Sequence, residues 1–372
     1  MRPIFAMTDP ESEILKEEEN PFENYAAVVE SDDRTIYLYL LPTQNENLPA
    51  HAVWLRNLIE APDEPDQKSI QEGRPPLMHV QGCNHPEGAI RYESEDLDFV
   101  WFPEGNGVSL YHRGELEAIL PTWSGREHVS GYSREALGYQ SNTLPLPKKD
   151  SAIYQRLQDN LEFWDRRTKA DDWESFRNGL LQHYESILGP HRQYYALTDV
   201  KFPVLGIVEF SLPEGILYAT LGMSRQPMPG IELIKQEPEH FVRREIFLFS
   251  PKIDATGVSD DYASLGGALD ELRSKYPGLL GRLARYPWIV SAALDHGHLF
   301  ESGMEANYCD FIFSESPLPT RLPEEIMSGL MQHYSVEGFS LSPLFALPAT
   351  QEDLLVARQK GADFWLEKRM RN

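Results

Sequence analysis

The chain has few cysteines, no long apolar run and no obvious leader segment. Its two cysteines, Cys83 and Cys309, exclude a disulfide scaffold and a four-cysteine zinc site, and they fit a reducing compartment. The apolar run 288–294 is far shorter than the ~18 residues that a membrane-spanning helix needs. The N-terminus turns acidic by Asp9 and lacks the apolar stretch of a signal peptide. We therefore expect a soluble, cytoplasmic protein.

Basic side chains are also scarce. Lys and Arg number 34 against 58 Asp and Glu, so the net charge is -24. Residues 1–150 hold 27 acidic and 12 basic side chains, and residues 151–372 hold 31 and 22. This field opposes a polyanion, so a nucleic-acid ligand is not expected. The acidic surface either serves solubility alone or steers a basic partner protein toward the chain, and both interpretations stay open.

Three common catalytic motifs are absent from the sequence. It has no Gly-x-Ser-x-Gly pentapeptide of an α/β-hydrolase and no Gly-Lys pair of a P-loop. The glycine-rich segment 105–110 lies between two predicted strands, so no helix N-terminus follows it to bind a phosphate. These absences leave no catalytic residue and no cofactor to assign, and we expect a protein that is not an enzyme.

Two histidine clusters form the alternative to that expectation. His79, Cys83 and His85 lie within seven residues, and His296 and His298 form a second cluster. Zinc accepts imidazole and thiolate ligands, but a tetrahedral site needs further groups from elsewhere in the chain. A metal-dependent enzyme is therefore a second hypothesis, whereas surface or hydrogen-bonded histidines are the simpler interpretation. No metal ligand is assigned.

The N-terminal part of the sequence is predicted to be rich in strands. Five segments combine aromatic and β-branched residues with turn signals. They are residues 26–29, 35–41, 97–102, 108–112 and 116–120. The acidic segment 11–23 predicts a solvated helix or arm, and the proline-rich segment 61–76 predicts a loop.

Helical spacing of apolar residues begins after the proline-rich segment 144–150. The predicted helices run from Ile153 through Leu157 and Leu161 to Trp164, from Asp171 to Ile187, from Leu265 to Tyr276, over 278–285, from Pro323 to Tyr334, and from Thr350 with a break at Gly361. The pairs Asp171–Glu174 and Thr350–Asp353 have the spacing of helix-capping residues. Strands are predicted at 202–210, 215–221, 243–249 and 307–313.

This pattern predicts an α/β fold class, with mixed α+β sheets flanked by helices, in two domains. We expect a β-rich α+β domain over residues 1–147, a linker or connecting helix over 148–170, and a second domain over 171–372.

Three stretches of the second domain resemble the Suppressor of fused (SUFU) domain family. They are residues 183–190, residues 218–224 (Tyr-Ala-Thr-Leu-Gly-Met-Ser), and residues 341–348 with 350–354 and 361–362. Segment 99–111 is similar to a region that often precedes bacterial members. In the second stretch, Gly222 can adopt a backbone conformation that other residues rarely reach.

The resemblance implies a SUFU-like α/β domain that acts as a non-enzymatic protein-binding module. The animal member of the family is a cytoplasmic regulator that sequesters a zinc-finger transcription factor in Hedgehog signalling, and bacterial relatives include immunity proteins that neutralise toxins. We therefore expect a bacterial immunity-type protein that binds a basic toxin domain directly, with no membrane partner. A regulatory or structural scaffold without a toxin partner is a further alternative, and no partner-binding residue is assigned.

Overall fold

The computed structural model describes most of the chain, and its contacts divide it into two compact units. The described residues are 12–43, 45, 47–124, 131–138, 143–167, 169, 172–197, 202–252, 268–304 and 308–371. The units are Met1–Lys169 with Ile289–Ser291, and Ala170–Trp288 with Ala292–Asn372. The domain boundaries expected from the sequence stay predictions. None of the helices within the described residues is long and apolar enough to cross a membrane.

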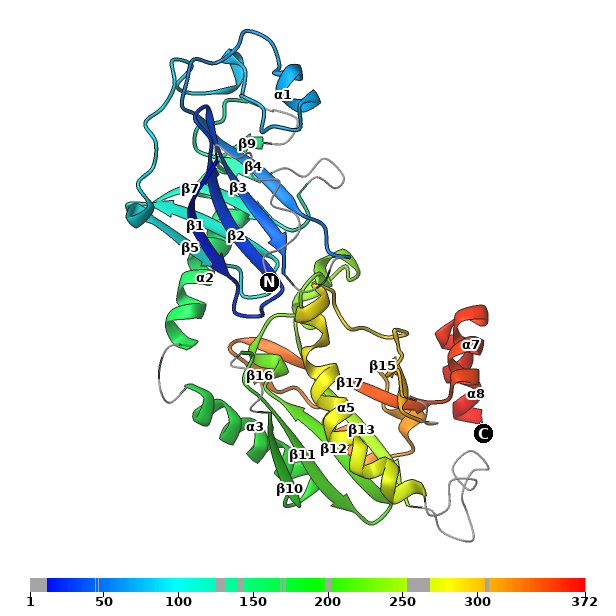
Figure 1. Ribbon diagram of the computed structural model, residues 1–372. Coiled ribbons are helices and arrows are strands. Elements are labelled where there is room, and N and C mark those ends of the chain that lie inside the picture. The colour runs from blue at the N-terminus through cyan, green and yellow to red at the C-terminus, as the bar shows by residue number, and fades with distance from the viewer. Residues whose placement is uncertain are drawn as a thin grey trace. The chain divides into compact units, whose positions relative to one another are not determined.

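The first unit contains two β-sheets and two helices (Figure 1). One sheet has the antiparallel order β1-β2-β3-β4, with β1 Glu13–Glu19, β2 Tyr25–Ser31, β3 Thr35–Pro42 and β4 His51–Asn57. The other has the order β5-β6-β7-β8-β9, with β5 Leu97–Trp101, β6 Gly107–His112, β7 Glu115–Pro121, β8 Gly131–Ser133 and β9 Thr143–Pro145. The helices are α1 Gln67–Gln71, within the predicted loop, and α2 Ala152–Arg167. The five strands predicted from the sequence are thus confirmed.

Alternate residues of both sheets build one apolar core. Leu38 and Leu40 of β3 share a buried cluster with Val108 and Leu110 of β6, as expected where every second side chain of a strand points to the same face. Gly131 of β8 lies so close to Val53 of β4 that a Cβ atom there would approach the Val53 Cβ to 2.6 Å. Glycine at this position therefore lets the two strands approach each other.

Helix α2 packs on the second sheet through a face slightly rotated from the predicted one. Leu157 is buried against Phe102 and Ile119, and the Trp164 Nε1–H donates to the Trp101 carbonyl at 2.7 Å. Leu161, predicted on the same face, is 41% exposed. Asn160 is buried instead, because the contact face is centred on the Leu157–Trp164 line and residue 161 lies at its margin.

The acidic N-terminal segment is a strand, so the prediction of a helix or arm was wrong. β1 pairs with β2 from Glu13↔Ser31 to Glu19↔Ala26. Leu15 is buried in the core, and the Trp101 Nε1–H donates to the Glu18 carboxylate at 2.9 Å. The run of charges has no periodicity that separates strand from helix, so pairing with β2 decides its conformation.

The second unit contains one eight-stranded sheet, in the order β10-β11-β12-β13-β17-β15-β14 with β16 paired to β17. Its strands are β10 Gln193–Leu197, β11 Leu205–Leu212, β12 Gly215–Leu221, β13 Arg243–Pro251, β14 Leu299–Phe300, β15 Asp310–Ser314, β16 Ser335–Val336 and β17 Phe339–Ala349. β13 and β17 pair in parallel. The four strands predicted here are confirmed, with shifted ends.

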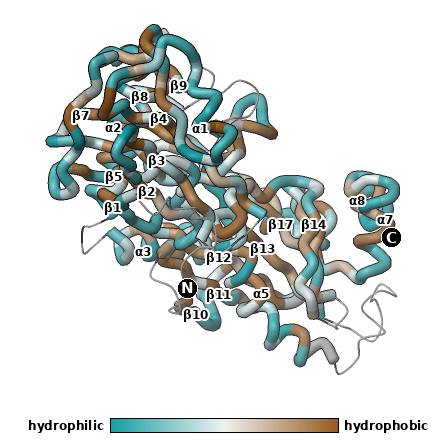
Figure 2. Tube along the Cα trace, turned by 45° about the horizontal axis from the view of Figure 1, so that its top comes forward, coloured by the Kyte–Doolittle hydropathy of each residue, from teal (hydrophilic) through white to brown (hydrophobic). Residues whose placement is uncertain are grey.

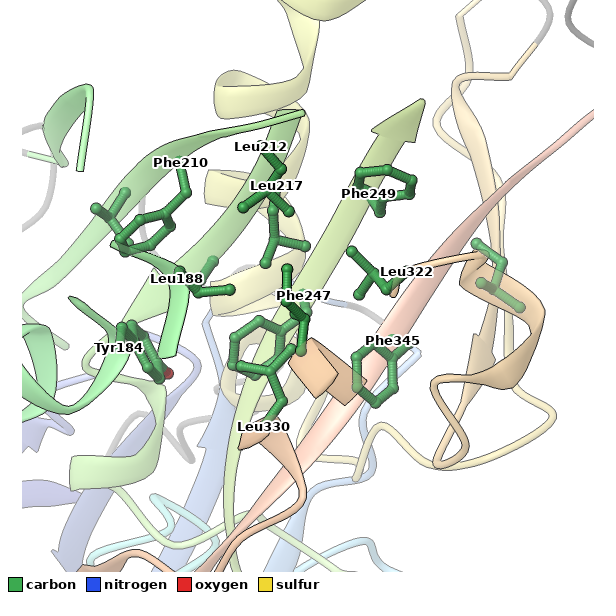
Figure 3. Packing of buried hydrophobic residues seen from close by; sticks show 14 of the residues in the cluster. Tyr184, Leu188, Phe210, Leu212, Leu217, Phe247, Phe249, Leu322, Leu330 and Phe345 are labelled. Carbon is green, nitrogen blue, oxygen red and sulfur yellow. The ribbon is translucent and has the colours of Figure 1, made fainter. Parts of the chain in front are cut away.

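Helices pack on this sheet. They are α3 Asp172–Leu188, α5 Ala268–Val290, α6 Glu324–Leu330, α7 Gln351–Lys360 and α8 Ala362–Arg371. Figure 3 shows Tyr184 of α3 and Leu330 of α6 beside Phe210, Phe247 and Phe345 of the strands, in one buried cluster. Figure 1 shows α5 lying across the sheet. The mixed α/β fold class predicted from the sequence is confirmed.

Helix α5 is continuous where two helices were predicted. Pro277 lies inside it, although a proline removes the hydrogen bond to the carbonyl four residues earlier, here that of Arg273. The Tyr218 hydroxyl of β12 donates to this Arg273 carbonyl at 3.3 Å, and the Tyr218 and Tyr276 rings meet edge to face. The sheet thus supplies the donor that Pro277 lacks, which is why the helix continues.

The C-terminal helices begin and break where the sequence predicts. The Thr350 hydroxyl accepts from the Asp353 N–H at 3.2 Å, and the Asp353 carboxylate accepts from the Thr350 N–H at 2.9 Å. Gly361, with φ 92°, separates α7 from α8. The predicted pair Asp171–Glu174 cannot be compared in this way, since Asp171 lies outside the described residues.

We expect Tyr218→Phe to lower the free energy of unfolding by about 1–2 kcal/mol, because the Arg273 carbonyl loses its donor. In a Pro277→Ala background, which restores a backbone N–H at position 277, the same change should cost less. Urea unfolding of the four proteins in this double-mutant cycle measures the difference. Tyr286→Phe, at a more exposed hydroxyl, is the control, and equal losses in both backgrounds would contradict the explanation.

Candidate functional site

β13 begins with three consecutive charged residues, and all three are buried. Arg243 is 4% exposed, and Arg244 and Glu245 are 0% exposed. The strand then turns apolar (Figure 2). Burying a charge is costly unless it is paired and hydrogen-bonded. The partners of these three side chains therefore define the most constrained polar region of the second unit.

The Glu245 carboxylate holds the turn that follows β12. Its Oε1 accepts from the Gly222 N–H at 2.9 Å, the Ser224 N–H at 3.0 Å and the Ser224 hydroxyl at 2.7 Å. Its Oε2 accepts from the Thr220 hydroxyl at 2.6 Å. The Thr220 hydroxyl also accepts from the Ile246 N–H at 2.7 Å. The carboxylate thus fills the space where β12 and β13 separate.

Burial and hydrogen bonding act on Glu245 in opposite directions. Burial raises its pKa, whereas the hydrogen bonds from Thr220, Ser224 and Gly222 lower it, and the pKa stays above that of an ordinary glutamate. Gly222 adopts φ 112°, and a Cβ there would lie 2.5 Å from the Val204 carbonyl oxygen. The unusual turn predicted at Gly222 is confirmed, and it requires glycine.

Arg243 fastens the same turn from the other side. Its Nη1 donates to the Arg225 carbonyl at 2.6 Å and to the Ser224 carbonyl at 3.3 Å, and its Nη2 lies 3.2 Å from the Glu337 carboxylate. The turn is therefore held by a carboxylate that accepts from its N–H groups and by a guanidinium that donates to its carbonyls.

Arg225, at the end of this turn, links it to α3. Its guanidinium pairs with the Asp172 carboxylate and stacks near the Trp173 and Phe176 rings, at 5.3 and 5.4 Å from their centroids. A cation above an aromatic face gains electrostatic attraction in addition to the ion pair. The N-terminal turn of α3 thereby supports the turn after β12.

Arg244 belongs to a group of four charges. Its Nη2 lies 2.7 Å from both the Asp295 and the Glu315 carboxylates. Lys235 Nζ lies 3.1 Å from Asp295 and 2.9 Å from Glu315. Both cations also lie over the Phe241 ring. Two cations and two carboxylates make this group, which we call the charged quartet, neutral overall.

The charged quartet shifts the titration of its members. Burial raises the pKa of Glu315, but hydrogen bonds from Arg244 and Lys235 outweigh it and lower the pKa to about 2. Burial lowers the pKa of Lys235, and its contacts with Glu315 and Asp295 raise it above the usual value. The quartet therefore stays charged and paired over the whole physiological pH range.

The quartet fixes a loop that displays apolar side chains. The segment 222–242, which we call the anchored loop, contains the short 3-10 turns Met223–Arg225, Ile231–Leu233 and Pro238–His240. Leu233 is 71% exposed and Ile234 is 47% exposed. They directly precede Lys235, which is bound to the quartet. Because the neighbouring charges are paired and largely buried, this arrangement maintains a shape and presents two apolar groups, rather than offering a free acid or base.

We expect Glu245→Gln to destabilise the protein by about 3–5 kcal/mol, because the amide places N–H groups where N–H and O–H donors already point. Thermal or urea unfolding of the full chain measures the loss. Glu239→Gln, at an exposed carboxylate of the anchored loop, is the matched control. A similar small effect for both variants would contradict the role assigned to Glu245.

The histidines of the predicted metal clusters are engaged in hydrogen bonds. His296 lies with Nε2 2.8 Å from the Asp363 carboxylate, and its Nδ1 accepts from the Glu315 N–H at 3.2 Å. His298 accepts from the Asp295 N–H through Nδ1, and burial lowers its pKa. These two side chains therefore bind protein groups rather than converging on a common point.

The other cluster is dispersed in the same way. His85 Nδ1 lies 2.6 Å from the Glu135 carboxylate, and the Cys83 thiol lies 3.6 Å from the His79 carbonyl oxygen. No group of three or more His, Cys, Asp or Glu side chains that could hold a metal ion occurs within the described parts of the chain. The metal-dependent hypothesis based on His79, Cys83, His85, His296 and His298 thus receives no support from their geometry.

We expect His85 to make stability depend on pH. The hydrogen bond and the charge of Glu135 raise the pKa of His85 above 6.5. A raised pKa in the folded state contributes stability that is complete below pH 6.5 and is lost as the pH rises through the folded-state pKa. His85→Gln should remove this component of the pH profile of unfolding, while His333→Gln, at an exposed histidine, should leave it. An unchanged profile for His85→Gln would refute the link.

The comparison with known families now identifies the second unit. Residues 204–372 match the family model of the Suppressor of fused protein (SUFU). The resemblance predicted from the sequence is confirmed, and this part of the chain is a SUFU domain. The match starts after α3, so the predicted stretch 183–190 precedes it, whereas the other two stretches lie within it. No curated protein matches the chain.

The SUFU family is a family of non-enzymatic protein-interaction domains, so residues 204–372 carry a protein-interaction domain. The structure explains the distinctive stretch 218–224, since its Thr220, Gly222 and Ser224 are the residues that bind Glu245. Sequence reasoning missed Glu245 and the two arginines before it. The available signal was the triplet Arg-Arg-Glu directly before the apolar run 246–249 of a predicted strand.

Proposed function

We propose that this protein acts by binding another protein directly, and that the anchored loop of the SUFU domain is the contact surface. The observation that carries this proposal is the exposure of Leu233 and Ile234 beside Lys235, which the charged quartet holds. Apolar side chains presented on a fixed backbone bind with little loss of conformational freedom. The surrounding charges are already paired, so few of them need to be stripped of water without a partner.

The finer proposal concerns the partner, which we expect to be basic. The net charge of -24 favours rapid encounter with a cationic protein through complementary fields. A toxin enzyme with a cationic substrate channel, such as a nuclease, has this property. The resemblance to bacterial members supports the same assignment, in which the protein acts as an immunity protein. Two buried cysteines without a disulfide fit a cytoplasmic location.

The experiment uses the tagged full chain expressed in its native host. We expect a single basic protein, encoded nearby, to co-purify in stoichiometric amounts, and its enzymatic activity to be inhibited by the purified chain. The double variant Leu233→Ser/Ile234→Ser should weaken binding by at least about 30-fold, as loss of a central apolar contact does. Titration calorimetry with the purified partner measures the change.

The matched control is Leu355→Ser, which removes an equally exposed leucine from α7 and should leave binding intact. Equal affinities for the loop variant and the control would refute the assignment of the anchored loop. Absence of any co-purifying protein at several salt concentrations would refute direct binding. A partner that is bound but not inhibited would favour the scaffold alternative over toxin immunity.

A further inference from the structure

Two buried polar side chains beside the charged quartet have atoms without a hydrogen-bond partner among the described residues. Gln226 is 0% exposed, and neither its Oε1 nor its Nε2 is bonded. Arg244 is 0% exposed, and its Nε and Nη1 are likewise unbonded. Buried polar atoms in native proteins are nearly always satisfied, by protein groups or by an ordered ligand. Two such side chains in one region therefore need an explanation.

The backbone places Gln226 beside Arg244. The Ser224 N–H bonds the Glu245 side chain, and four residues later the Met228 N–H donates to the Val242 carbonyl at 2.8 Å. The segment after the turn therefore runs antiparallel to the start of β13, and Gln226 lies between these two contacts. The Trp288 Nε1–H donates to the Pro227 carbonyl at 3.2 Å, so α5 also contacts this segment.

The charges decide what kind of ligand fits. The Nη2 of Arg244 is already shared by Asp295 and Glu315, and Lys235 completes a neutral quartet. An additional anion would leave that quartet with an excess negative charge in a buried place. The unbonded atoms comprise donors on both side chains and an acceptor on the Gln226 amide. A neutral ligand that both accepts and donates meets these requirements.

We propose that ordered water is bound between the Gln226 amide and the Arg244 guanidinium. Such a water accepts from the arginine and donates to Oε1 of the glutamine, as buried waters with about three polar partners do. It connects the anchored loop to β13 at the point between the Glu245 and Met228 contacts. This site is a structural ligand site and stands whether or not the loop binds a partner protein.

A high-resolution crystal structure of the full chain tests the site directly. We expect a water molecule within hydrogen-bonding distance of both Gln226 and Arg244. A dry site, or an anion whose anomalous signal appears after bromide exchange, would overturn the proposal.

A stability measurement gives an independent answer. Gln226→Met keeps the length of the side chain but removes its polar atoms. If water bridges the two side chains, this variant removes a partner of the water and should lower Tm by about 2–4 °C. If the site is dry, the variant removes an unsatisfied amide and should raise Tm, which would overturn the proposal. Gln193→Met, at an exposed glutamine of β10, is the control and should change Tm little.

Discussion

Glu245 accepts four hydrogen bonds from Thr220, Gly222 and Ser224, at the point where β12 and β13 separate. The anchored loop depends on this contact, because the loop leaves the sheet through the turn that the carboxylate holds. Arg243 binds the carbonyls of the same turn, and Arg244 binds the carboxylates that hold Lys235. One buried strand end thus fixes both ends of the loop that presents Leu233 and Ile234.

The choice of charged residues at this strand end has a physical consequence. Apolar side chains of similar volume can stabilise a core as well as a buried ion pair does, but they accept many alternative arrangements. A carboxylate with four donors and a guanidinium with defined acceptors tolerate one backbone path. We interpret the triplet Arg243–Glu245 as a device that specifies the path of the loop. Apolar packing of the sheet, shown in Figure 3, supplies the bulk of the stability.

Local signals in the sequence were sufficient for much of the fold. The predicted strands 35–41 and 215–221 were found because β-branched and aromatic residues lie between turn residues. The Thr350–Asp353 cap was found because both partners lie within one turn. The errors arose where distant residues compensate a local penalty. β1 is a strand because β2 pairs with it, and α5 continues through Pro277 because Tyr218 donates to Arg273.

The sequence by itself determined the α/β class, the acidic character of the protein and the membership of its C-terminal part in the SUFU family, because composition, periodicity and short motifs are local properties. It also pointed to the turn 218–224, though not to the residue that holds it. Only the tertiary structure brought Glu245, Asp295 and Glu315 to their partners, which lie 21 to 71 residues away in the chain. Carboxylates are too common in this sequence for spacing alone to single out three of them, whereas burial and hydrogen-bond geometry distinguish them at once.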